Sequence, residues 1–171
     1  FHVASRLVAS NGLGIFCDHS DVLSTRTTGF ALLSSGSVQQ VMDLTPVAHL
    51  SAIKGRVPFL NFFDGFRTSH EIQKIEVLEY DELASLVDYQ ALNAFRRNAL
   101  NPDHPCTRGT VQNSDIHFQQ REVINRYWNE LPEIVEGYMA EIKKLTGREY
   151  HLFNYYGAPD AERMIVAMGS M

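Results

Sequence analysis

Apolar and polar positions along the chain follow strand and helix periods in turn, in the order typical of an α/β fold. Residues 1–5 have the pattern of a strand, and residues 57–63 form a nearly continuous apolar run, as in a parallel strand buried on both faces. Between them, apolar positions recur over residues 38–53 with a helical period. This order predicts a mostly parallel sheet covered by helices.

Capping signals predict where the first helices begin. Ser37 and Gln40 have capping-box spacing at the start of the first helix, and Pro46 is expected to kink or restart that helix. Thr68 and Glu71 have the same spacing and predict a second, short helix after the buried strand.

The second half of the chain has mainly helical periodicity. Residues 81–100 predict two helices, with Asp88 as the N-cap between them, and a turn-rich loop follows at residues 101–105. A long helix is expected after Pro132, ending at Gly147. Its apolar stripe consists of Leu131, Ile134, Val135, Tyr138, Met139, Ile142 and Leu145.

The last residues predict a change of domain. Residues 150–156 have the pattern of a short aromatic strand, residues 157–160 that of a linker, and residues 163–170 that of a buried strand that enters a turn. We therefore predict a domain boundary near residue 150. Both ends of the chain look cut, so we expect a piece of a larger protein.

Composition excludes several classes of partner. The 171 residues include 15 basic and 20 acidic side chains, and the net charge of −5 argues against nucleic-acid binding. No apolar run approaches the ~20 residues of a membrane-spanning helix. Cys17 and Cys106 are too few for a thiolate cluster, and the absence of an N-x-S/T sequon also favours an intracellular, reducing compartment.

Arg6 is the first candidate functional residue. It directly follows the strand of residues 1–5, and ligands of open α/β sheets bind outside the carboxyl ends of strands. An arginine there can bind a carboxylate with two parallel N–H···O bonds. On position alone, a surface arginine or an internal ion pair is the better interpretation.

Two polar loops are further candidates. Asp18, His19 and Asp21 could form a metal or acid–base site, but carboxylates that cap a helix through Val22 explain this cluster better. The loop from Asp64 to Glu71 is either a functional loop or a turn with an Asp64–Arg67 ion pair, and the residues alone do not separate these alternatives.

No complete catalytic or metal-ligand set is present. Ser51 and Lys54 match the S-x-x-K pattern of some serine enzymes, but the accompanying motifs are absent and chance explains the match better. His104 and Cys106 are only weak metal-ligand candidates, and no nucleotide-binding glycine motif occurs.

Several runs of the sequence closely resemble the pyruvate:ferredoxin (flavodoxin) oxidoreductase family. The most specific is F-F-D-G-F-R-T-S-H-E at residues 62–71, and the similarity continues in order over essentially all 171 residues. The other matching runs are residues 14–21, 28–31, 35–39, 47–50, 108–113, 118–122 and 157–163.

The resemblance implies a large enzyme that oxidatively decarboxylates pyruvate to acetyl-CoA and CO₂. Thiamine diphosphate, Mg²⁺ and [4Fe–4S] clusters are its implied cofactors, with ligands outside this segment. Pyruvate, coenzyme A, and ferredoxin or flavodoxin are its implied partners. A homodimer is implied for the intact enzyme, in the anaerobic metabolism of the cytoplasm or of a hydrogenosome-like organelle.

The resemblance also assigns parts of the chain. Residues 1–150 would be the later part of a transketolase-like, pyrimidine-binding domain, and residues 151–171 a linker and the first strand of the next domain. The family strand H-V-x-x-R ends in the arginine that binds the pyruvate carboxylate, which is Arg6 here. The loops with Asp18, His19, Asp64 and Arg67 are family signatures near the site without an assigned role.

Two residues depart from the family pattern. Cys17 stands where glycine is usual and could strain its turn, and Pro46 stands where a helix former is usual. Alternative functions are a related 2-oxo acid oxidoreductase, a pyruvate:NADP oxidoreductase fusion, or a non-catalytic α/β interaction module. A serine hydrolase is more remote, and the fragment alone is expected to be inactive.

Overall fold

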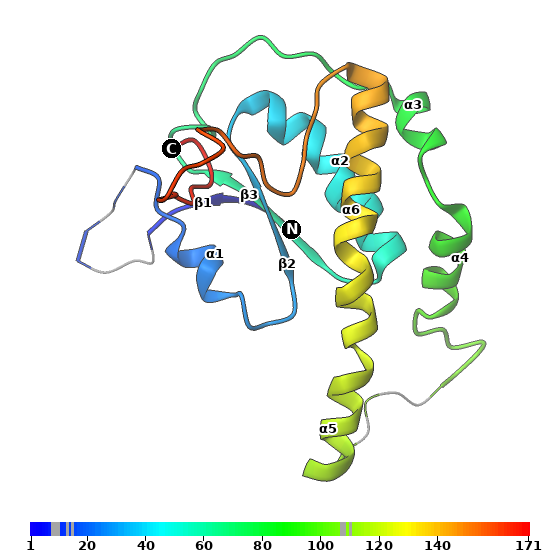
Figure 1. The fold of residues 1–171 in the computed structure, drawn as a ribbon. Helices are drawn as coiled ribbons and strands as arrows, with labels where there is room; N and C mark the ends of the chain where they lie inside the picture. Colours follow the sequence, from blue (N-terminus) through cyan, green and yellow to red (C-terminus); the bar gives the residue numbers. More distant parts are fainter. Residues whose placement is uncertain (8–10, 13, 15, 107–108, 110) are drawn as a thin grey trace.

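In the described part of the chain, three parallel strands form an open sheet (Figure 1). The computed structural model describes residues 1–7, 11–12, 14, 16–106, 109 and 111–171. The strands are β1 (His2–Ser5), β2 (Ala31–Ser35) and β3 (Phe59–Asp64), in the spatial order β1-β3-β2. The predicted parallel α/β architecture is therefore confirmed.

The register brings the carboxyl ends of the strands to one edge of the sheet. Ser5 pairs with Asp64 across β1 and β3, and Ser35 pairs with Phe63 across β2 and β3. Because all three strands run in the same direction, the residues that follow them meet at this edge. Arg6, Gly36 and Gly65 are the first residues beyond the strands.

Helices cover both faces of β3, as its apolar sequence predicts. Phe59 packs on the face beneath helix α2 (Val38–Gly55), in a core that includes Val47 and Met139. Leu60 and Phe62 point to the opposite face, where they pack with Val22 of helix α1 (Ser20–Ser24). Alternate side chains of one strand therefore build two separate cores.

Helix α2 begins at the predicted cap. The Ser37 hydroxyl accepts a hydrogen bond from the Gln40 backbone N–H at 3.2 Å, while the Gln40 side chain accepts one from the Gly36 N–H at 2.6 Å. The helix continues through Pro46 to Gly55, so the predicted restart is wrong. The surrounding core keeps the segment helical although the proline lacks an N–H.

Helix α6 (Asn125–Thr146) packs across α2. It begins before Pro132, earlier than predicted, and ends as predicted at Gly147, whose φ of 74° is left-handed. Gly55 lies at the close approach, since a Cβ there would lie 2.7 Å from Leu131 Cδ1 and would displace that side chain. The buried residues of α6 are Leu131, Val135, Tyr138, Met139 and Ile142, all from the predicted stripe.

Three shorter helices complete the described part of the chain: α3 (Tyr80–Ser85), α4 (Tyr89–Arg97) and α5 (Ser114–Val123). Asp88 caps α4 as predicted, accepting the Ala91 N–H at 2.9 Å. In Figure 1, α5 and the start of α6 project away from the sheet. No helix among the described residues is long and apolar enough to cross a bilayer.

Three predicted elements are wrong. Residues 68–71 form a turn rather than a helix, and the buried Thr68 hydroxyl caps nothing, having no hydrogen-bond partner. Residues 150–156 and 163–170 contain no strand, and Ile165 is 92% exposed. An apolar run becomes a strand only beside another strand, and neither segment joins the three-stranded sheet. The domain boundary near residue 150 stays a prediction.

Candidate functional site

Arg6 lies at the carboxyl edge of the sheet, where the sequence places it. Its backbone N–H donates to Asp21 Oδ2 at 2.9 Å, which ties the end of β1 to α1. Its guanidinium Cζ lies 4.2 Å from the centroid of the Phe66 ring. No carboxylate among the described residues forms an ion pair with Arg6, which argues against the internal ion pair as its role.

A buried carboxylate–imidazole pair lies at the same edge. Asp64, the last residue of β3, pairs with the ring Nε2 of His19, and both side chains are less than a tenth exposed. The His19 ring packs edge-on against Phe62, with the ring centroids 5.3 Å apart. The two polar loops singled out in the sequence therefore meet at one point.

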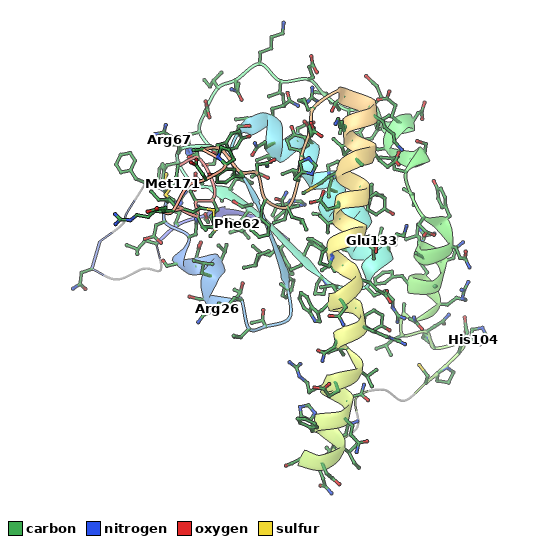
Figure 2. All side chains as sticks on the ribbon, viewed as in Figure 1. Arg26, Phe62, Arg67, His104, Glu133 and Met171 are labelled. Carbon is green, nitrogen blue, oxygen red and sulfur yellow. The ribbon has the colours of Figure 1, made fainter. Side chains whose placement is uncertain are left out.

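The carboxyl-terminal turn of the chain closes over this pair. The Ser170 N–H donates to Asp64 Oδ2 at 2.5 Å. A Cβ on Gly169 would lie 2.8 Å from Asp64 Oδ1 and 2.9 Å from His19 Cε1, so only glycine fits. Figure 2 shows Met171 and Arg67 at this end of the sheet, and His104 far from it.

Hydrogen bonding keeps the Asp64 carboxylate ionised despite its burial. Burial by itself raises the pKa of Asp64, but the hydrogen bonds from Ser170 and His19 outweigh it, and the pKa lies below its usual value. Asp64 and His19 therefore bind each other, and Asp64 also binds the turn that contains Ser170. This pair occupies the edge of the sheet beside Arg6, and Arg6 has no carboxylate partner among the described residues that would compete with a ligand.

Asp18 and Asp21 satisfy backbone groups around the start of α1. Asp18 Oδ1 accepts the Ser20 N–H at 2.8 Å, and the hydrogen bonds from Ser20 lower the pKa of Asp18. Asp21 accepts the N–H groups of Arg6 and Val22. The capping interpretation is therefore supported for these carboxylates. Cys17 has a φ of 37°, in agreement with the strain expected at that turn.

The proposed Asp64–Arg67 ion pair is wrong. Among the described residues, the ion-pair partner of Asp64 is His19. Arg67 is exposed. The turn after β3 is instead built by the Asp64 carbonyl, which accepts the N–H groups of Thr68 and Ser69 at 3.1 Å. The side chain of Arg67 therefore points to solvent rather than to the paired carboxylate.

The described residues do not form a ligand set for Mg²⁺ or an iron–sulfur cluster. No three His, Cys, Asp or Glu side chains among them are grouped as a metal ion requires. The buried carboxylate at the carboxyl edge, Asp64, already accepts hydrogen bonds from protein groups. The residues of this segment fit the recognition of an organic anion through Arg6 better than the coordination of a cation.

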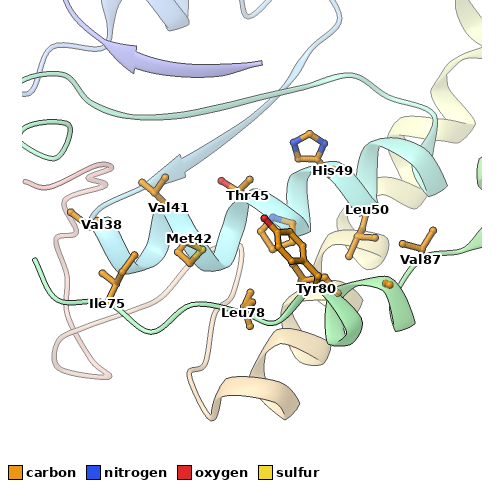
Figure 3. A pocket seen from close by; sticks show the side chains of 13 residues that line it. Val38, Val41, Met42, Thr45, His49, Leu50, Ile75, Leu78, Tyr80 and Val87 are labelled. Carbon is orange, nitrogen blue, oxygen red and sulfur yellow. The ribbon is translucent and has the colours of Figure 1, made fainter.

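An apolar cavity of about 640 Å³ lies between α2 and the segment of residues 75–87 (Figure 3). Val41, Met42 and Leu50 of α2 line it together with Leu78 and Tyr80. None of the candidate site residues contributes to its wall. Its lining suits an apolar partner and not a small carboxylate, so the candidate site remains at the carboxyl edge of the sheet.

Sequence reasoning missed two residues of the site. Phe66 and Ser170 contact Arg6 and Asp64, respectively, through tertiary contacts that no local motif encodes. The pairing of the two predicted parallel strands could have indicated the first contact, since it places the residues after Ser5 beside those after Asp64.

An open parallel sheet flanked by helices places the chain in the α/β class of proteins. A family model for the pyruvate flavodoxin/ferredoxin oxidoreductase, thiamine diphosphate-binding domain matches residues 1–140. The chain belongs to this family.

Similar proteins include oxidoreductases from different organisms. The chain is 67% identical over all 171 residues to the pyruvate-flavodoxin oxidoreductase of Klebsiella pneumoniae. It is 61% identical over 170 residues to the pyruvate:ferredoxin oxidoreductase of Moorella thermoacetica. A pyruvate dehydrogenase [NADP(+)] of Cryptosporidium parvum is 51% identical over 170 residues. The chain spans only 15%, 14% and 9% of these proteins, respectively.

Proposed function

We propose that the chain is a segment of a thiamine diphosphate-dependent pyruvate oxidoreductase, in which Arg6 binds the carboxylate of pyruvate. The reaction takes pyruvate and coenzyme A to acetyl-CoA and CO₂, and two electrons leave singly to flavodoxin or ferredoxin. The observation that carries the proposal is the position of Arg6 at the ligand-binding edge in a chain so similar to these enzymes. Thiamine diphosphate supplies the nucleophilic carbon and electron sink of such a decarboxylation.

Arg6 would act by orientation. A guanidinium that binds both carboxylate oxygens fixes the neighbouring keto carbon, which lowers the entropic cost of its reaction. The substrate carboxylate leaves as CO₂, so the ion pair is present with the substrate and lost in the product. Arg6 therefore selects a 2-oxo acid, with little effect on the later electron transfer.

Other parts of the longer enzyme would complete the machinery. We propose that the Mg²⁺ ligands and the cluster cysteines lie there, and that the intact enzyme uses coenzyme A and is a homodimer. The cytoplasm is the proposed compartment in a bacterium, supported by the Klebsiella and Moorella relatives, or a hydrogenosome-like organelle in a eukaryote.

An NADP-linked enzyme is the second candidate. The Cryptosporidium relative has the same identity to this chain, 51%, as the pyruvate-flavodoxin oxidoreductase of Rhodospirillum rubrum. Sequence identity in this segment therefore does not distinguish NADP-linked relatives from flavodoxin-linked ones. Assay of the full-length enzyme with NADP, ferredoxin and flavodoxin separates these candidates, and assay with longer 2-oxo acids tests for a related oxidoreductase.

The substitution Arg6→Leu in the full-length enzyme tests the proposal. Two charged hydrogen bonds are worth about 3 kcal/mol together, so the KM for pyruvate should rise about 100-fold. The contents of thiamine and iron should stay at wild-type levels. Arg6→Lys should restore only part of the affinity, because it keeps the charge but loses the two-pronged geometry. An unchanged KM in Arg6→Leu would refute the assignment.

A further inference from the structure

The Arg6 side chain lies between the end of β1 and the turn that follows β3. The Gly65 N–H donates to the Ser5 carbonyl at 2.9 Å, which continues the pairing of the two strands beyond their ends. The next residue of the turn, Phe66, presents its ring to the Arg6 guanidinium, with Cζ 4.2 Å from the ring centroid. This distance is well within the range of a cation–π contact.

Gly65 allows this close approach. A Cβ at this position would lie 2.9 Å from Arg6 Cγ, 3.1 Å from Arg6 Nε and 2.5 Å from the Ser5 carbonyl oxygen. The aliphatic stem of Arg6 therefore rests directly on the glycine backbone. The Arg6 side chain therefore has two contacts with this turn. Its stem lies against Gly65, and its guanidinium lies over the Phe66 ring.

Phe66 adopts a backbone conformation that a bulky residue rarely takes. Its φ is 65°, in the left-handed region. Local contacts maintain this conformation: the Phe66 N–H donates to Ser69 Oγ at 2.8 Å, and its carbonyl accepts the His70 N–H at 3.2 Å. The His70 ring stacks on the Phe66 ring, with centroids 5.0 Å apart. Strain that surrounding contacts maintain is concentrated at functional sites.

We propose that Phe66 is a positioning residue, whose ring face holds the Arg6 guanidinium ready to bind the substrate carboxylate. A guanidinium on an aromatic face directs its N–H groups outward in its own plane, where a carboxylate accepts two of them. Fixing the guanidinium before binding removes part of the entropic cost of binding. The inference rests on the proposed role of Arg6.

The test compares Phe66→Leu with Phe66→Tyr in the full-length holoenzyme. Leucine keeps the apolar character and the Cβ but removes the ring, so the KM for pyruvate should rise about three- to tenfold. The kcat at saturating pyruvate should change less than about twofold, because the charge of Arg6 is retained. Tyrosine keeps the ring face and should leave the KM at the wild-type value. Equal effects of leucine and tyrosine would overturn the proposal.

Phe66→Gly removes the ring and the backbone strain together, so it provides the test even if the leucine variant does not fold. It should raise the KM to the same degree as leucine. A wild-type KM in the glycine variant would overturn the proposal.

A double substitution separates this inference from the assignment of Arg6. If Phe66 acts through Arg6, then Phe66→Leu should add less than about twofold to the KM of the Arg6→Leu enzyme. A high KM in Arg6→Leu with a normal KM in Phe66→Leu would overturn the role of Phe66 alone. A normal KM in Arg6→Leu would overturn the proposed function itself.

Discussion

At the scale of single residues, positive φ angles mark the turns around the site. Cys17 at 37° and Phe66 at 65° both lie in the half of conformational space that favours glycine. The two differ in what they contact. The Phe66 ring contacts Arg6, whereas the Cys17 sulfur is 3.9 Å from Asp64 Oδ2 and 3.7 Å from Ser170 Oγ, long distances for hydrogen bonds.

Cys17→Gly should therefore stabilise its turn. Glycine removes a conformational cost of about 1 kcal/mol and gives up only weak sulfur contacts. Hydrogen exchange of residues 16–24 in the full-length protein should slow about fivefold, the rate change that corresponds to about 1 kcal/mol. Cys106→Ala, at an exposed position, serves as the control and should change nothing. Faster exchange in the glycine variant would contradict the strain argument.

The same contrast shows how far sequence reasoning reaches at this scale. Strain at Cys17 could be predicted because the family pattern has glycine there. The strain at Phe66 could not, since a phenylalanine in a turn carries no signal of its φ. The position of Arg6 followed from one strand, but its contact with Phe66 depends on the pairing of two strands that lie far apart in the sequence.

At the scale of elements, a buried ionic network fastens the end of α6 to α2. Asp43, fully buried in α2, accepts hydrogen bonds from Arg148 Nε at 2.6 Å and from the Tyr150 hydroxyl at 2.6 Å. Arg148 also binds Glu76. Burial and the bond to Asp43 raise the pKa of Tyr150 to about 12, and the carboxylates raise the pKa of Arg148.

The two charges of this network should respond unequally to substitution. Arg148→Met leaves the Asp43 carboxylate buried without its cation, which should cost about 3 kcal/mol in the free energy of unfolding. Asp43→Asn should cost less, because Arg148 is 25% exposed and can reach water. Urea denaturation of the two variants gives the comparison. If Asp43→Asn lowers the free energy of unfolding more than Arg148→Met does, the argument that Asp43 is the more deeply buried charge is contradicted.

Helical elements were predicted better than the strands at the end of the chain. Ser37, Asp88 and Gly147 are local stop and start signals, and each lies where it was expected. Residues 150–156 and 163–170 have apolar strand patterns without a neighbouring strand in the sheet. Sequence separations of 105 and 107 residues between Asp43 and its partners Arg148 and Tyr150 likewise hide the ionic network from any local pattern.

At the scale of the whole molecule, Asp64 joins the sheet to the last turn of the chain. Its pKa is lower in the folded protein than in the unfolded chain, so its ionised form stabilises the folded state. This stabilisation is fully present above the unfolded pKa of about 3.9 and disappears as the pH falls through the folded value.

Hydrogen exchange of residues 164–171 in the full-length protein measures this effect. After correction for intrinsic rates, exchange should accelerate as the pH falls below about 4. In Asp64→Asn, exchange should be faster at neutral pH and lack that acid-dependent step. A wild-type acid profile in the variant would show that another group anchors the turn.

The central position of β3 in the sheet also determines when the sheet can assemble during protein synthesis. β1 and β2 each pair with β3 and not with each other. On the ribosome, residues 1–58 therefore emerge before β3, the strand with which β1 and β2 pair in the described part of the chain. Until then their backbone groups depend on water or on a chaperone, and a ribosome that pauses after residue 64 has left the exit tunnel would give the nascent sheet time to assemble.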